Sequence, residues 1–376
     1  MTSPWPGSSG LDVSGNQFNA STTYGNFLYI EASASPLDLQ DVKVCRNQVR
    51  GVEVPATSVI GALVALDLRD FTSVENVAIS NNDFDRIFNG PNNIHGVRLW
   101  CNTKSKRISI TQNVVAGVGQ VNGTAFFVTL DDADGVTLSN NQVSGNSTVG
   151  SNSPGVRLYL VAASRSVRVS NNTFEGATVT LPSQAILVDA TGALTDLFVD
   201  KNDIFSYENG VLLNVADVTG LSLSGNAVKD FEGIALKMLA TGACRDLTFE
   251  GNRSRATSGT PTGWDLNLGT DCSVLAFSHN LVDISPLLVV STVAMSLTTG
   301  SGTFKNFVFT GNVFRGSVGG ITYTPVLGVY PDFCTFMGNI GDDVSASSWS
   351  QFVGSWTNVL PTPIATFQNF NIDNGT

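Results

Sequence analysis

The feature that most constrains the fold of this chain is a short phrase that returns along nearly its whole length. Its clearest copy is Val167–Phe174, where Val167 and Val169 alternate with polar residues, Asn172 follows, and an apolar residue stands two places later. The Asn of each copy is Asn16, Asn47, Asn82, Asn113, Asn141, Asn172, Asn202, Asn226, Asn252, Asn280, Asn312 and Asn339. The repeat is therefore about 29 residues long, and a period of about 20–50 residues is typical of solenoids, propellers and other arrays.

Each repeat reads as two alternating strands, one ending at the Asn and one after a variable connection. Examples of the second strand are Val64–Leu68, Val97–Trp100 and Val156–Leu160. No amphipathic helix of ten or more residues separates the strands, which argues against a βαβ sheet or a leucine-rich horseshoe. A propeller blade would need about 40 residues and four strands. The sequence therefore predicts an all-β fold over residues 11–340. It is a single-stranded parallel β-helix, wound from one chain, with about 12 coils.

The repeated Asn has a physical role at the bend of each coil. Asn tolerates left-handed backbone angles, and its amide can hydrogen-bond to identical amides in the coils above and below. A Gly precedes five of these residues (Gly15, Gly225, Gly251, Gly311 and Gly338), where it would relieve the same bend. The apolar residues two places later, which include Phe18, Phe84, Phe174, Ile204 and Phe314, are predicted to stack in the interior. We therefore predict an Asn ladder.

Three segments are expected from the extent of the repeat: a turn-rich lead-in (1–10), the β-helix (11–340), and a C-terminal segment (341–376). The last contains Trp349, Phe352 and Trp356 and reads either as a cap that closes the helix or as an oligomerisation segment. No capping helix precedes the first coil. Because an uncovered coil end is a sheet edge, we expect either that further N-terminal sequence is missing or that a partner covers it.

Composition excludes several function classes. Charged residues make up 14% of the chain, the net charge is −11, and no basic cluster occurs, so nucleic-acid binding is not expected. No run reaches the roughly 18 apolar residues of a membrane span, and no membrane insertion or cofactor is expected. The five cysteines lack CxxC spacing, which argues against zinc. Cys244 and Cys272 each stand eight residues before their Asn, so they should occupy adjacent layers as either a disulfide or two buried thiols.

Candidate functional residues gather on the outward side of the second strands. Strand alternation places a mixture of aromatic, guanidinium and carboxylate side chains there. They are Asp67, Arg98, Trp100, Phe127, Asp131, Arg157, Tyr159 and Asp189. Aromatic faces stack on sugar rings, Arg grips carboxylate or sulfate groups, and paired carboxylates perform glycosidic acid–base chemistry. The strip is a candidate carbohydrate groove, and its alternatives are the packing face of a trimer or ordinary solvated surface.

The repeated apolar-x-apolar-Ser-x-Asn-x-apolar phrase over residues 11–340 resembles right-handed parallel β-helix proteins of the pectate-lyase-like superfamily, most of all phage tailspikes and receptor-binding proteins. The resemblance implies a right-handed coil, a homotrimer on the virion surface, an N-terminal virion partner, and recognition of bacterial surface polysaccharide. Because this fold carries many functions, two alternatives stay open. They are a monomeric secreted polysaccharide lyase or glycoside hydrolase, and a non-catalytic rod or adhesin.

If the protein is also a depolymerase, we expect Asp67, Asp131 and Asp189 to supply the carboxylates. Arg98 and Arg157 would then hold acidic sugars, and Trp100, Phe127 and Tyr159 would stack on sugar rings.

Specific catalytic signatures are poor. Asp131-Asp132 and the stretch around His95 are faintly similar to polygalacturonase motifs, but their order is reversed and the strand pattern should keep them apart. Asp131, Asp132 and Asp134 could bind a hard cation, although an acidic turn ending at Gly135 is the simpler interpretation, and no metal site is predicted. His279, directly before Asn280, is expected to be a turn residue.

Overall fold

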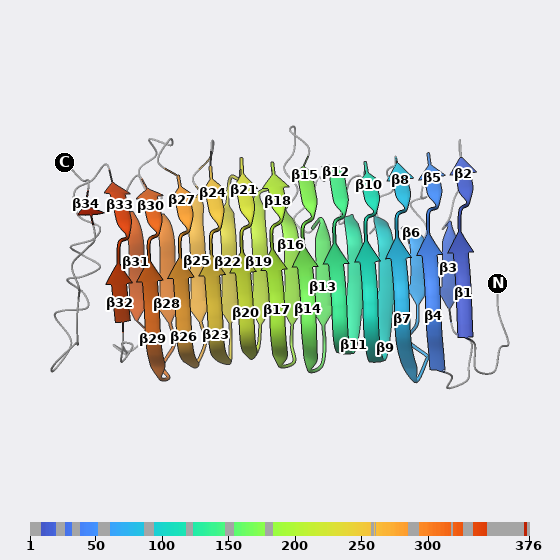
Figure 1. The fold of residues 1–376 in the computed structure, drawn as a ribbon, viewed down its shortest axis with the longest axis horizontal. Coiled ribbons are helices and arrows are strands. Elements are labelled where there is room, and N and C mark those ends of the chain that lie inside the picture. Colours follow the sequence, from blue (N-terminus) through green and yellow to red (C-terminus); the bar gives the residue numbers. More distant parts are fainter. Residues whose placement is uncertain are drawn as a thin grey trace. The chain divides into compact units, whose positions relative to one another are not determined.

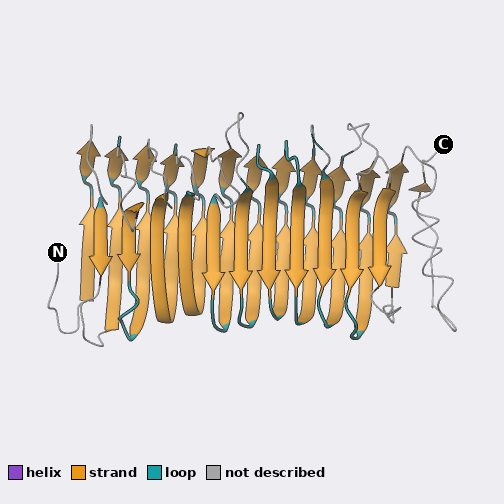
Figure 2. Ribbon diagram, turned by 180° about the vertical axis from the view of Figure 1, so that it is seen from behind, coloured by secondary structure: helices purple, strands orange, loops and turns teal. Residues whose placement is uncertain are grey.

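The computed structural model describes residues 9–19, 27–31, 38–51, 61–85, 94–117, 123–146, 154–176, 183–256, 259, 261–284, 293–316, 319–325, 334–343 and 372–373. The chain divides into two compact units. Unit 1 comprises Met1–Ala193 and Asn202–Tyr207, and unit 2 comprises Leu194–Lys201 and Glu208–Thr376. Each is a parallel β-solenoid without a helix among the residues described (Figures 1 and 2).

The coils of unit 1 contribute strands to three columns. The first column precedes the ladder Asn and contains β1 (Ser9–Ser14), β4 (Asp38–Cys45), β7 (Ser73–Ser80), the later parts of β9 (Ile94–Thr111) and β11 (Thr124–Ser139), and β14 (Ser164–Ser170). The second follows the Asn and contains β2 (Gln17–Asn19), β5 (Gln48–Arg50), β8 (Asp83–Asp85), β10 (Val114–Ala116), β12 (Gln142–Asn146), β15 (Thr173–Gly176) and β18 (Asp203–Phe205). The third contains β3 (Leu28–Glu31), β6 (Gly61–Asp67), the starts of β9 and β11, β13 (Val156–Leu160) and β16 (Gln184–Ala190).

Unit 2 repeats the same three columns. Its first column is β17 (Leu194–Asp200), β20 (Val218–Ser224), β23 (Ala243–Glu250), β26 (Asp271–Ser278), β29 (Phe304–Thr310) and β32 (Cys334–Met337). Its second is β21 (Ala227–Lys229), β24 (Arg253–Arg255), β27 (Leu281–Asp283), β30 (Val313–Gly316), β33 (Ile340–Asp343) and β34 (Ile372–Asp373). Its third is β19 (Asn209–Val215), β22 (Ile234–Ala240), β25 (Thr262–Leu268), β28 (Val293–Thr299) and β31 (Gly319–Pro325).

These columns confirm the predicted parallel β-solenoid and are consistent with right-handed winding. The sequence pattern showed two strands per repeat clearly, and the structure adds the short strand that follows each Asn. Residues 1–8, 344–371 and 374–376 lie outside the described residues, so most of the expected lead-in and C-terminal segment is not described.

The Asn ladder is present in each unit. In unit 1 each ladder residue from Asn16 to Asn202 is linked to the next by an Nδ2–Oδ1 hydrogen bond of 2.8–3.0 Å. In unit 2 the residues from Asn226 to Asn339 are linked in the same way, with bonds of the same lengths. Asn172 shows the full pattern, because its Nδ2 also donates to the Leu138 carbonyl and its Oδ1 also accepts from the Asn141 backbone. The buried amide thus has all of its polar atoms satisfied, as burial of a polar group requires.

The left-handed residue of the bend is not the ladder Asn, as expected from the sequence, but the residue before it. Where a glycine does not occupy this position, positive φ occurs at Arg46, Asn81, Gln112, Asn140, Asn171, Lys201 and His279. Because this residue turns the chain, the following Asn is free to point its amide inward. His279 therefore belongs to the bend, as predicted.

A second left-handed column lies directly before the first apolar residue of each phrase. Its members include Asp41, Asn76, Arg107, Gly135, Ser166, Asp196, Gly220, Asp246, Val274 and Asn306. The acidic stretch 131–134 is part of this bend: it lies within the continuous strand β11, whose register shifts between Leu130 and Asp132. The predicted acidic turn is therefore a bent, irregular strand.

The interior is filled by stacked apolar side chains. Phe84, Phe174, Ile204 and Phe314 are fully buried as predicted, whereas Phe18 is half-buried. In unit 2 the rings of Phe249, Phe277 and Phe309 stack with centroids 4.7 Å apart.

The two cysteines expected in adjacent layers are register partners. Cys244 on β23 pairs with Cys272 on β26, and both are buried free thiols. Burial raises the pKa of Cys244 to about 11 and raises that of Cys272 further.

Candidate functional site

The register of the third column in unit 1 arranges the outward side chains in two rows. The first row is Tyr29, Ala65, Arg98, Phe127, Arg157 and Leu187. The second row is Glu31, Asp67, Trp100, Thr129, Tyr159 and Asp189. Intervening residues such as Leu66, Leu99 and Leu158 are buried in the core. Seven of the eight predicted site residues therefore belong to two rows of neighbouring side chains.

Asp67 and Trp100 form one cluster together with Arg69, which lies just beyond β6. Both carboxylate oxygens of Asp67 accept from the Arg69 guanidinium, at 2.6 Å from Nε and 2.5 Å from Nη2. The Arg69 Cζ atom lies 4.1 Å from the centroid of the Trp100 ring, and that of Arg98 lies 5.0 Å away. The Trp100 Nε1 donates to Asn102 at 2.6 Å. The indole is held in place, and both carboxylate oxygens of Asp67 are engaged by Arg69.

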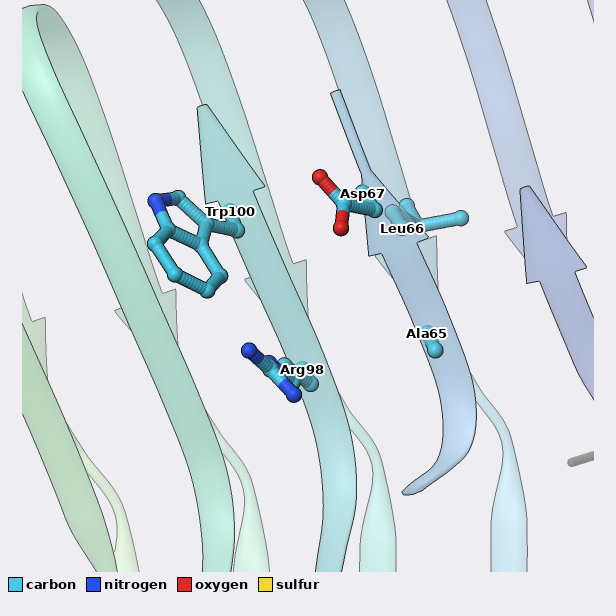
Figure 3. A pocket seen from close by; sticks show the side chains of 5 residues that line it. All are labelled: Ala65, Leu66, Asp67, Arg98 and Trp100. Carbon is cyan, nitrogen blue, oxygen red and sulfur yellow. The ribbon is translucent and has the colours of Figure 1, made fainter. Parts of the chain in front are cut away.

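A shallow depression lies at this cluster, lined by Ala65, Leu66, Asp67, Arg98 and Trp100 (Figure 3). Figure 3 shows Arg98 and Trp100 projecting from β9 beside Asp67 on the neighbouring β6. Its empty space is about 160 Å³, with open solvent included. Pockets that enclose a small ligand typically measure about 300–1,000 Å³, so this surface is suited to a ligand lying across it.

Phe127 is the centre of a second cluster, which we name the Phe127 cluster and define as His95, Arg98, Phe127 and Arg157. The His95 ring stacks on Phe127 with centroids 4.8 Å apart, and the Arg157 Cζ atom lies 5.6 Å from the Phe127 centroid. The Nη2 of Arg157 is 3.3 Å from the Asp189 carboxylate. In the register, Arg98 and Arg157 flank Phe127 on its two neighbouring strands.

His95 is the most strongly perturbed titratable group of this face. Burial, and then the charges of Arg98 and Arg157, lower its pKa to about 3, so the ring is neutral near pH 7. Its Nδ1 is buried and has no hydrogen-bond partner among the described residues. Desolvation also lowers the pKa of Arg98, although the guanidinium stays charged at neutral pH.

The three predicted catalytic carboxylates do not converge. Asp67 and Asp189 lie four strands apart in the column, about 19 Å at the usual strand spacing. Asp131 lies beyond the second row, two strands from each, which places it about 10 Å or more from both. Glycoside hydrolases hold their two carboxyl groups about 5–9.5 Å apart. These residues therefore do not form the pair that hydrolysis requires.

The expected separation of His95 and Asp131 is also observed. His95 is the register partner of Thr124, and Asp131 stands seven residues farther along β11, about 23 Å for an extended strand. Asp134 pairs instead with Arg165 at 2.6 Å, a hydrogen bond that lowers the pKa of Asp134. Within the described parts of the chain, no group of three or more His, Cys, Asp or Glu residues could hold a metal ion.

Four residues of this face were missed as site candidates. Tyr29 and Glu31 extend the two rows by one coil, and Glu31 is the register partner of Asp67. Burial, and then a hydrogen bond to Glu31, raises the pKa of Tyr29. Strand alternation places Arg69 on the outward face, two residues after Asp67, but it was not among the predicted site residues. No sequence signal indicated that His95 would stack on Phe127.

The matching rows of unit 2 carry smaller or less aromatic side chains. The first row contains Leu212, Lys237, Asp265 and Ser296, and the second contains Asn214, Leu239, Asn267 and Thr298. The concentration of aromatic and guanidinium groups is thus a property of the unit 1 rows.

The residues described include no helix that is long and apolar enough to cross a membrane. Comparisons of the chain with protein-family models, with curated proteins and with solved structures found no significant match.

Proposed function

We propose that this protein is a tailspike-type receptor-binding protein on the virion surface, a homotrimer that recognises bacterial surface polysaccharide through the two outward rows of unit 1. The observation that carries the proposal is the register of those rows. They present Trp100, Phe127 and Tyr159, interleaved with Arg98 and Arg157, on three consecutive strands. Such a surface offers flat rings for stacking and forked donors for acidic or hydroxyl groups.

Recognition is better supported than hydrolysis. Both oxygens of Asp67 are held by Arg69, Asp189 pairs with Arg157, and the carboxylates are too far apart for an acid–base pair. A shallow surface fits a polymer that lies across several coils better than it fits a small molecule.

The test is a binding screen of the full chain against purified bacterial capsular and lipopolysaccharide glycans, followed by Trp100→Ala. Removing the indole should weaken binding at least tenfold, since the ring is preoriented by Arg69 and Asn102. The matched control is Leu239→Ala, which removes an exposed apolar side chain from the second row of unit 2. No binding to any glycan, or equal binding by the two variants, would contradict the proposal.

A further inference from the structure

We propose that the Phe127 cluster is a subsite for an acidic sugar residue, with the ring on Phe127 and the anionic group on Arg98. This inference rests on the proposed function and narrows its ligand to anionic glycans. It adds His95, which takes no part in the rows described above, as a group that contacts the sugar.

The guanidinium groups of this face differ in their carboxylate partners. Three guanidinium groups lie on this face, and two of them have carboxylate partners: Arg69 pairs with Asp67 and Arg157 with Asp189. The Arg98 guanidinium is half-buried and feels the charge of Asp67, but in the part of the chain that the structure describes it makes no ion pair and no side-chain hydrogen bond. A partly desolvated cation without a carboxylate in direct contact favours an anionic ligand, because charge-assisted bonds are the strong ones.

Two buried polar atoms beside Phe127 lack hydrogen-bond partners among the described residues. The Nδ1 of His95 and the Nε of Arg157 are both buried, and neither has a hydrogen-bond partner among the described residues. His95 itself is only 5% exposed. Its other ring nitrogen can make the hydrogen bond to the Thr124 backbone, which leaves Nδ1 of the neutral ring as an acceptor. The cluster therefore presents one buried acceptor and one buried donor without partners.

A sugar residue supplies what both atoms lack. Both atoms are covered in this structure, so the side chains of Phe127 and Arg157 must turn aside before a hydroxyl group can donate to His95 Nδ1 and a hydroxyl or ring oxygen can accept from Arg157 Nε. Arg98 and Arg157 lie one strand on either side of Phe127, so their backbones are about 10 Å apart. The Phe127 ring thus lies between two cationic side chains, with the His95 ring stacked on it and the Arg157 guanidinium over it. A neutral glycan would satisfy the hydroxyl contacts but leave Arg98 without its anion.

The experiment measures binding of the full chain to polygalacturonate, alginate and uronate-containing capsular polysaccharides, each beside its carboxyl-reduced form. Reduction removes the charge and keeps the polymer backbone. Dextran sulfate beside dextran distinguishes sulfate from carboxylate as the anion. We expect at least one anionic polymer to bind tenfold or more tightly than its neutral counterpart, and Arg98→Gln to bring the ratio of the two affinities down to about one.

The matched control is Arg165→Gln, which removes an exposed arginine bonded to Asp134 outside the rows and should keep the preference. His95→Phe retains an aromatic partner for Phe127 and removes the acceptor, so it should weaken binding of both forms. The thermal unfolding midpoint of each variant shows whether it folds. If Arg98→Gln does not fold, Arg157→Gln takes its place in the binding measurements.

The outcomes separate the inference from the proposed function. Equal binding of anionic and neutral forms, with Arg98→Gln behaving like wild type, would overturn the acidic subsite and leave polysaccharide recognition standing. Absence of binding to every polymer here and in the bacterial glycan screen would contradict both.

Discussion

At Val274 the repeat places a β-branched side chain in the left-handed backbone region, with φ of 61°. Branching at Cβ makes this conformation costly, whereas Asn and Gly tolerate it. The equivalent positions on the neighbouring strands are Asp246 and Asn306, which both have positive φ. The Val274 side chain is 39% exposed, so little packing offsets the cost.

Replacing Val274 with Asn should therefore stabilise the fold by about 1 kcal/mol. The measurement is the denaturation midpoint in urea at constant m-value. Val161→Asn is the matched control, because Val161 is equally exposed (40%) but is not among the residues with positive φ. A midpoint that falls for Val274→Asn, or that rises equally for both variants, would show that backbone strain is not what limits this position.

The ladder is the element that links one coil to the next inside each bend. Asn172 takes part in five ladder hydrogen bonds: it donates to Leu138 and twice to Asn202, and it accepts twice from Asn141. Asn172→Ala should leave several of these buried groups unpaired and lower stability by about 1–3 kcal/mol. Chemical denaturation checks the size of the effect.

The control for the ladder is the adjacent residue of the same bend. Asn171 is exposed and adopts φ of 53°, so Asn171→Gly should change stability by no more than about 0.5 kcal/mol. If Asn172→Ala leaves the midpoint where it is in the wild type, the amide network does not stabilise the solenoid.

The sequence predicted the elements whose signal is periodic. The strands, the inward aromatic residues and the ladder all follow from side chains that recur at fixed positions, because stacking requires like residues in like places. The left-handed column before the Asn was only partly visible, since Arg46, Gln112 and Lys201 occupy it without a glycine or asparagine signature.

The dependence on periodic signals also explains which parts of the candidate site the sequence predicted. Strand alternation placed Arg98, Trp100, Phe127 and Arg157 on one face, and the register shows them as neighbours. Asp131 stands two residues beyond Thr129 and so lies past the second row, where the register between β11 and β9 shifts; strand alternation gives the face of a residue but not its distance along the strand. The pairing of Asp67 with Arg69 depends on side-chain conformations, which no periodic pattern encodes.

At the scale of the whole molecule, the outward rows differ between the two units. Those of unit 1 carry Trp, Tyr, Phe and Arg, which are also the residues enriched in protein interfaces. Those of unit 2 carry residues such as Lys237, Asp265 and Asn267. A glycan surface and a subunit interface can use the same residue types, so the oligomeric state decides where a glycan has access.

A homotrimer should have a mass near three times the 39.6 kDa chain by light scattering. Each chain carries a net charge of −11, so three associated chains repel one another and assembly needs a large, well-packed interface. Because salt screens that repulsion, the trimer should persist or strengthen as NaCl is raised from 0.05 to 0.5 M. A large interface should also keep the trimer intact on tenfold dilution. A constant mass of one chain would contradict the trimer and favour a monomeric secreted protein. A trimer that dissociates as salt rises would instead indicate an interface held by exposed ion pairs.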